Sequence, residues 1–311
     1  MTRLAVFVAA FLLAAAGEAR ASAAVWIDTD PSIGPPWREV DDAFALVLAF
    51  HSPELRIAGI STTYGNVGVR RATTVARDLV RRFGGAAGVH EADVYAGVPN
   101  PRDVGSQSAA SEALAQALRR ERLTYIALGP LTNLAAFLKL HPTLASRIDR
   151  VVFVGGMSPG YEPVFGPSGT LRIHDANVFK DPAAARAVFA SRIPIVLAPV
   201  ETSSALVINR SDARRLQDGG AAGAFLHRRS RAWLWFWTSV VRHPGGVMFD
   251  SLAVLRVARP DLVATEPRYA HVNAAGDLIA SKRRVANARR VSFCAGIAPG
   301  AREIVVDRLS R

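Results

Sequence analysis

The chain has 311 residues, of which 50% are hydrophobic and 21% charged, and its formal net charge is +12. This composition excludes an intrinsically disordered chain, and the sole cysteine, Cys294, excludes an intrachain disulfide, so packing must stabilise the fold. The arginines are scattered over helix-like stretches without an aromatic platform or a nucleic-acid motif, so we expect no nucleic-acid partner.

The first residues have the pattern of a secretory signal peptide. Arg3 precedes an unbroken apolar run over residues 4–16, and Ala21-Ser22-Ala23 offers a small-residue cleavage site. A membrane anchor needs roughly 20 apolar residues, and the stretch 17–20, which contains two charges, interrupts this run too early. We therefore expect residues 1–23 to be removed. The mature protein would carry a net charge of +11, be periplasmic or secreted, and have no membrane attachment.

Strand-like and helix-like segments alternate through the rest of the chain. The predicted strands are residues 25–27, 55–63, 94–96, 123–128, 151–154 and 193–198. The predicted helices between them are residues 41–50, 69–83, 109–120, 131–140 and 181–190. Continuous apolar strands separated by helices predict a mostly parallel, doubly wound (Rossmann-like) sheet, which binds ligands at the carboxyl ends of its strands. We expect one α/β domain over residues 24–311, with a C-terminal hairpin formed by residues 269–273 and the segment from residue 278.

Four carboxylates meet at the first strand-to-helix connection. Asp28 and Asp30 end the first predicted strand, and Asp41 and Asp42 begin the next helix. An acid at a helix start is ordinarily an N-cap, but that explains only one of the four. Several carboxylates at the mouth of a buried strand repel one another unless a cation lies among them. Calcium accepts six to eight oxygen ligands in irregular geometry, so the spacing predicts a metal site.

These residues resemble the N-terminal signature of the inosine-uridine-type nucleoside hydrolases, Asp-x-Asp-Pro followed by Asp-Asp-Ala. The segment 128–135, Leu-Gly-Pro-Leu-Thr-Asn-Leu-Ala, is a close match to the central motif of that family. Other segments resemble it in the same order along the chain: 63–67, 95–99, 154–157, 175–185 and 249–254. The resemblance extends over nearly the whole mature chain. It implies the nucleoside hydrolase fold and hydrolysis of the N-glycosidic bond of ribonucleosides to free base and ribose.

The resemblance also implies roles for individual residues. Asp30 matches the residue that binds calcium and acts as general base on the attacking water. Asp42, Asp250 and the backbone carbonyl of Leu128 match the other calcium ligands. The positions that match ribose contacts, with Asp41 also near calcium-bound water, are Asp41, Asn66, Asp175 and Asn177. Asp28 is expected to orient the loop from behind.

This set of residues suits the chemistry. Cleavage of a ribosyl bond passes through an oxocarbenium-like sugar. The enzyme then needs an activated water, anionic surroundings and a grip on the sugar hydroxyls. A bound cation lowers the pKa of water, and a neighbouring carboxylate takes the proton. Help for the leaving base must come from elsewhere in the site.

Three departures from the family concern the base. Residues 32–40 make a nine-residue spacer where the family has two, and Pro35, Pro36 and Trp37 predict a stiff loop that lies near the pocket or on the surface. Phe249 replaces a histidine and cannot donate a proton, so it either stacks on the base, as in a purine-specific branch, or belongs to the core. The His-Gly-rich stretch after residues 99–101 is missing, so base preference is not fixed by the sequence.

Other aromatic residues and histidines have two interpretations. Trp233 and Trp237 lie one helical turn apart, so they stack on the base or pack in the core. His243 supplies the missing acid or is an ordinary satisfied histidine, and His174 has the same two interpretations. The candidate base contacts are Trp37, Trp233, Trp237, His243 and Phe249.

Two other functions fit part of the sequence. The strand-ending Asp-x-Asp also resembles the haloacid-dehalogenase phosphatases, which use an Asp nucleophile and magnesium, but that assignment leaves Asp41-Asp42 and residues 128–135 unexplained. A secreted nucleoside- or sugar-binding protein with a vestigial calcium site is the second alternative. Release of phosphate, release of free base, or binding without turnover would separate the three. We expect a small-molecule nucleoside as the partner, and the sequence leaves a homo-oligomer open.

Overall fold

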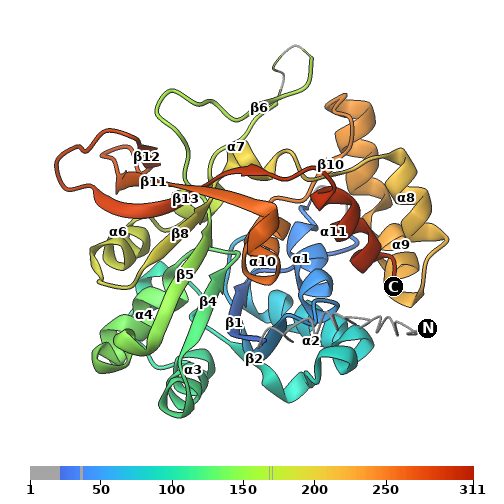
Figure 1. The fold of residues 1–311 in the computed structure, drawn as a ribbon. Coiled ribbons are helices and arrows are strands. Elements are labelled where there is room, and N and C mark those ends of the chain that lie inside the picture. The colour runs from blue at the N-terminus through green and yellow to red at the C-terminus, as the bar shows by residue number, and fades with distance from the viewer. Residues whose placement is uncertain (1–21, 36–37, 168, 170) are drawn as a thin grey trace, which may run out of the picture.

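The computed structural model describes residues 22–35, 38–167, 169 and 171–311. A nine-stranded sheet with the order β12-β11-β13-β8-β5-β4-β1-β2-β3 lies at the centre of the molecule (Figure 1). In chain order its strands are β1 (Ala23–Thr29), β2 (Leu55–Thr62), β3 (Val94–Ala96), β4 (Leu123–Ala127), β5 (Ile148–Val154), β8 (Ile195–Ala198), β11 (Val263–Val272), β12 (Leu278–Ser281) and β13 (Arg289–Ile297).

The sheet is parallel from β3 through β8 to β13, and β11 runs antiparallel to both β13 and β12. The predicted mostly parallel sheet is therefore confirmed. The predicted C-terminal hairpin is confirmed as well, because β11 and β12 pair from Val272–Leu278 to Tyr269–Ser281. The parallel strands end at one edge, so the residues that follow them meet there.

Helices cover both faces of the sheet (Figure 1). One face carries α1 (Asp41–Phe50), α2 (Val69–Phe83), α10 (Ser251–Ala258) and α11 (Ala301–Leu309). The other carries α3 (Ala109–Arg120), α4 (Thr132–Leu140) and α6 (Pro182–Ala190). Side chains along β1 alternate between these layers: Val25 and Ile27 pack in the first core and Trp26 in the second. Both cores are extensive, as the composition predicts.

The chain has several further elements outside the large sheet and its covering helices. They are the helices α5 (Ala176–Phe179), α7 (Val200–Ser203), α8 (Arg210–Gln217) and α9 (Ala221–Trp235), and a π-helical turn (Phe236–Val240). Two ribbons pair β6 (Val164–Phe165) with β7 (Leu171–Arg172) and β9 (Val207–Ile208) with β10 (Gly246–Val247). Short 3₁₀ helices span Gly84–Ala87, Glu91–Asp93, Pro101–Asp103, Pro142–Arg147 and Pro260–Leu262.

Local sequence explains where several helices begin. The Ser108 hydroxyl accepts a hydrogen bond from the Ser111 amide at 3.1 Å and starts α3. Asp181 caps α6 through the Ala184 amide at 2.9 Å, with Pro182 in the first turn, as predicted. The start of α1 differs, because its N-cap is Val40 and no side chain caps it. Neither acid of its first turn is used as a cap.

The predicted signal peptide lies almost wholly outside the described residues, as does Trp37. Over the residues that are described, none of the helices has the length and apolar character needed to cross a membrane.

Candidate active site

A cavity of about 380 Å³ opens at the carboxyl edge of the parallel strands. The cavity is lined by residues at the carboxyl ends of β1, β4 and β5, namely Asp30, Leu128 and Val154. The first turn of α1 and Asp250, the residue before α10, also line it. Six carboxyl groups line it: Asp30, Glu39, Asp41, Asp42, Asp175 and Asp250. So many acids in one largely buried space make a cation-binding site the natural interpretation.

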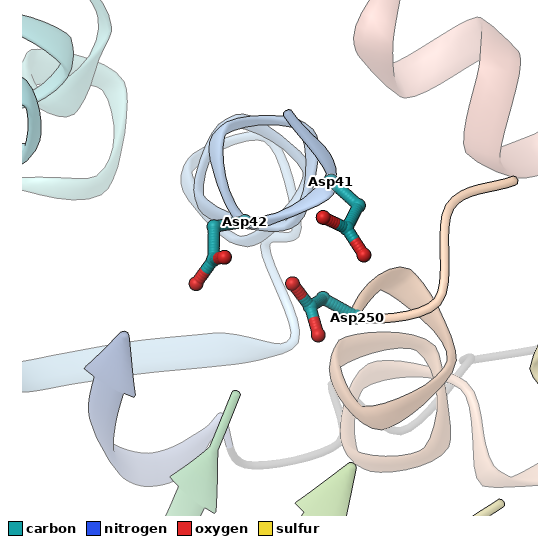
Figure 2. A group of neighbouring side chains, drawn as sticks. All are labelled: Asp41, Asp42 and Asp250. Carbon is teal, nitrogen blue, oxygen red and sulfur yellow. The ribbon is translucent and has the colours of Figure 1, made fainter. Parts of the chain in front are cut away.

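Three of these acids form a compact group. Asp41 and Asp42 extend from the first turn of α1, and Asp250 extends toward them from the turn before α10 (Figure 2). One carboxylate oxygen of each lies within 4.8 Å of the others, and all three side chains are buried. Burial, and then the neighbouring carboxylates, raise the pKa values of Asp41 and Asp250 well above their ordinary range. An all-oxygen, mutually repelling donor set of this kind fits a hard divalent cation.

Asp42 is fixed by the end of β1. One of its oxygens, Oδ1, accepts hydrogen bonds from the Thr29 hydroxyl at 2.5 Å and from the Asp30 amide at 3.0 Å. These bonds lower the pKa of Asp42, although burial, the larger effect, still leaves it raised. They also couple the strand to the first turn of α1, so the two Asp motifs form one rigid unit.

Asp30 lies in a cradle at the cavity floor. Its Oδ2 accepts a hydrogen bond from the Asn66 amide. A Cβ atom at Gly65 would come within 1.9 Å of that oxygen, so only glycine allows this approach. Burial, and then the charge of Asp42, raise the pKa of Asp30 well above its usual value, while Lys180 acts in the opposite direction. The geometry gives Asp30 the environment of a proton acceptor that faces the cavity.

The opposite wall carries Asp175 and Asn177. Asp175 accepts hydrogen bonds from the amides of Gly156 at 2.6 Å and Val178 at 3.3 Å, and burial raises its pKa to about 6. The Asn177 side-chain amide donates to the backbone oxygens of Leu128 at 2.6 Å and Val154 at 3.0 Å. The Leu128 carbonyl therefore already accepts one hydrogen bond, which comes from Asn177.

Asp28 lies next to the cavity-lining residues in the chain but does not itself line the cavity. Its Oδ1 accepts hydrogen bonds from the Ser61 hydroxyl at 2.6 Å and from the Asn133 side-chain amide at 2.7 Å. Its Oδ2 is buried and has no hydrogen bond of normal geometry among the described residues. Burial raises its pKa to about 6. Asn133 also accepts from the Val98 amide at 2.9 Å, so Asp28 ties β1 to β2 and to the residues after β3.

Aromatic side chains form one end of the cavity. Trp237 and Phe249 line it, and Phe165 packs edge-on against both, with ring centroids 5.2 and 6.0 Å away. Trp233 lies behind this wall and is buried. His243 faces Phe165 and Trp237 and bonds the Gly245 carbonyl through Nδ1 at 2.7 Å, outside the cavity. Of the aromatic and histidine candidates in the described chain, the structure therefore brings Trp237, Phe249 and His174 to the cavity.

Sequence reasoning missed two charged residues of the cavity. Glu39 is the charged neighbour that most strongly raises the pKa of Asp41, and Lys180 lowers the pKa values of Asp30 and Asp42. Glu39 lies in the predicted loop insertion, two residues before Asp41, and Lys180 lies between the matched Asn177 and Asp181. Both residues lie next to segments that match the family, and this closeness in sequence was the one indication that they line the cavity.

The comparisons with known proteins agree with this geometry. Residues 25–298 match the family model described as inosine-uridine preferring nucleoside hydrolase. Non-specific ribonucleoside hydrolase RihC of Escherichia coli (strain SMS-3-5 / SECEC) is 29% identical over 277 residues, which cover 81% of this chain and 84% of that protein. Uridine nucleosidase 1 of Arabidopsis thaliana is 30% identical over 263 residues, covering 76% of this chain and 74% of that protein.

Solved structures share the fold. The plant nucleoside hydrolase PpNRh1 superposes with a TM-score of 0.77 at 22% identity, covering 93% of this chain and 99% of that one. A purine-preferring ribonucleoside hydrolase from Gardnerella vaginalis gives a TM-score of 0.75 at 23% identity, covering 92% and 98%.

The chain is thus an N-glycosyl hydrolase built on the nucleoside hydrolase fold. The chain belongs to the inosine-uridine preferring nucleoside hydrolase family.

Proposed function

We propose that the protein hydrolyses the β-N-ribosyl bond of ribonucleosides with calcium as its resident cation. The observation that carries the proposal is the buried group of Asp41, Asp42 and Asp250 with the Asp30 carboxylate beside it in one cavity. The relatives named as ribonucleoside hydrolase and uridine nucleosidase support the substrate class. The proposed calcium ligands are the Asp30, Asp42 and Asp250 carboxylates and the Leu128 carbonyl. We add Asp41 as a ligand, because its carboxylate belongs to the compact group.

The cation has a defined task. When bound, calcium balances the carboxylate charges and lowers the pKa of water, so that hydroxide is available near neutral pH. Asp30 takes the proton from the attacking water, because its carboxylate faces the cavity and its backbone is fixed to Asp42 at 3.0 Å. The Gly65 cradle and the Asn66 amide prevent Asp30 from turning away.

The ribose end is held by the wall that carries Asp175 and Asn177. The Asn177 amide protons are occupied by two backbone carbonyls, so its Oδ1 is the atom left to accept from a sugar hydroxyl. Asp175 and the acids of α1 provide the negative surroundings that stabilise positive charge developing on the sugar. This proposed arrangement leaves the aromatic end for the base, where Trp237 and Phe249 offer ring faces for stacking.

We also propose that the protein is exported. The signal-peptide pattern of residues 1–23 supports this, and the mature chain would then act on nucleosides outside the cytoplasm.

The test is chromatography of free base and ribose after incubation with a panel of purine and pyrimidine nucleosides in the presence of calcium. We expect equimolar base and ribose. Phosphate release from nucleotides without base release would support a phosphatase, and nucleoside binding without products would support a binding protein. Either result would overturn the proposal.

A further inference from the structure

Glu39 lines the cavity, and the proposed reaction assigns no role to its carboxylate. It lies at the end of the loop insertion, just before α1, and lines the cavity beside Asp41. Its backbone oxygen accepts a hydrogen bond from the Asn66 side-chain amide at 2.8 Å. The loop is thereby tied to the Asn66 backbone that also holds Asp30, so Glu39 has a fixed position relative to the reacting end of the site.

The side chain is also fixed. Glu39 Oε2 accepts a hydrogen bond from the Trp233 indole at 2.6 Å. The Trp237 indole also acts on this carboxylate as a hydrogen-bond donor. Two indoles therefore position the Glu39 carboxylate, which lines the cavity.

A second indole faces Glu39. Trp237 is 1% exposed and lines the cavity, and its Nε1 has no hydrogen bond of normal geometry in the described chain. Burial, the larger effect, raises the pKa of Glu39, and the Trp233 and Trp237 indoles act in the opposite direction as hydrogen-bond donors. The Glu39 carboxylate is therefore held between two indoles at a corner of the cavity, where a donor on a ligand can reach it.

The position of this corner indicates which part of a ligand it meets. Glu39 lies between the metal-binding group of α1 and the aromatic wall of Trp237 and Phe249. A planar base stacked on that wall presents its edge, with its ring N–H and amino groups, to the side. A carboxylate that accepts hydrogen bonds distinguishes bases with such donors from those without.

We propose that Glu39 is a specificity-determining residue whose carboxylate accepts a hydrogen bond from an N–H group on the edge of the leaving base. The inference rests on the proposed nucleoside hydrolysis and narrows its substrates to nucleosides whose base carries such a donor. Trp233 is the positioning residue, because its indole fixes the carboxylate.

The experiment compares substrates that differ only at the base edge. Adenosine carries an amino group and inosine a ring N–H, whereas purine riboside has neither. For each, kcat/KM is measured with the wild type, Glu39→Gln, Trp233→Phe and, as a matched exposed control, Glu162→Gln. We expect Glu39→Gln to lower the preference for adenosine or inosine over purine riboside about tenfold, and Trp233→Phe to lower it in the same direction. Glu162→Gln should retain the wild-type preference.

Two outcomes would overturn the inference. One is an equal loss on all three substrates, which would place Glu39 in the fold or at the ribose. The other is an unchanged preference in Glu39→Gln. If the wild type releases no base from any nucleoside, the proposed function fails separately. In that case the preference for adenosine or inosine over purine riboside is measured as a ratio of dissociation constants, from the change in tryptophan fluorescence on binding. The effect of Glu39→Gln on this ratio then decides the role of Glu39.

Discussion

Removal of the divalent cation should destabilise the protein, and more so at higher pH. Burial, and then neighbouring carboxylates, hold the pKa values of Asp41 and Asp250 well above the ordinary value of 3.8. The cation-free folded chain therefore keeps protons that the unfolded chain has released. Its free energy of unfolding falls as pH rises above about 4, by about 1.4 kcal/mol per pH unit for each group, until that group's folded pKa is passed.

Calcium binding offsets this loss. At a free concentration 100 times the dissociation constant, calcium adds about 2.7 kcal/mol to the free energy of unfolding. A chain of this length has an unfolding entropy of about 0.6 kcal/mol/K near its midpoint, so the expected rise in Tm is about 5 °C. The rise should be larger at pH 8 than at pH 6, because at lower pH protons compete with the cation for the same oxygens.

Differential scanning fluorimetry with chelator or calcium at several pH values measures the effect. Asp250→Asn should abolish most of the calcium-dependent rise, since it removes one ligand from the compact group. Asp218→Asn, an exposed acid, should retain it. A wild-type Tm that calcium does not change at any of these pH values, in a sample that still releases base, would refute the metal-site reasoning.

Three further predictions concern single residues. Asp30→Ala should lower kcat for base release by about 10²–10⁴-fold and, because it removes a proposed calcium ligand, also reduce the calcium-dependent rise in Tm; normal turnover would exclude Asp30 as the general base. Asn177→Ala should lower kcat/KM about 10- to 100-fold, because the Leu128 and Val154 carbonyls lose their donor along with the proposed ribose contact; unchanged steady-state kinetics would contradict this. The free energy of unfolding of Asp28→Asn should rise relative to that of the wild type as pH rises from 4 to 8, by up to about 3 kcal/mol, because the pKa of Asp28 is raised to about 6. An asparagine amide oxygen can accept the two hydrogen bonds that Asp28 Oδ1 accepts. Denaturant titrations at both pH values measure this difference in free energy, and a difference that does not change with pH would count against a buried charge at residue 28.

Most of the parallel sheet and the helices that cover it could be predicted from the sequence. Strands and helices of the parallel part follow one another as buried apolar runs and amphipathic stretches, and α1, α2 and α3 begin and end at the predicted residues. The sequence analysis assigned no bounds to α8, α9 and β13, and β13 joins the sheet next to β8, far away in sequence. Local periodicity holds no information on such a pairing.

The candidate site divides in the same way. The acids on β1, α1 and before α10 could be named because each lies in a motif with a fixed place relative to a strand or helix end. Glu39 and Lys180 could not be named, because their entry into the cavity depends on the path of a loop and on side-chain direction. Trp233 and Trp237 were predicted to share one helix face, and both indoles approach the Glu39 carboxylate. Of the two, Trp237 lines the cavity and Trp233 does not.

Dependence of catalysis on the cation is measured as base release by the same enzyme sample before chelation, after it, and after calcium is restored. We expect chelation to abolish the release of free base and ribose and calcium alone to restore it. Asp250→Asn, measured in parallel, should recover little activity at the same calcium concentration. Full release of base in a sample shown by elemental analysis to contain no divalent cation would exclude a calcium-dependent reaction.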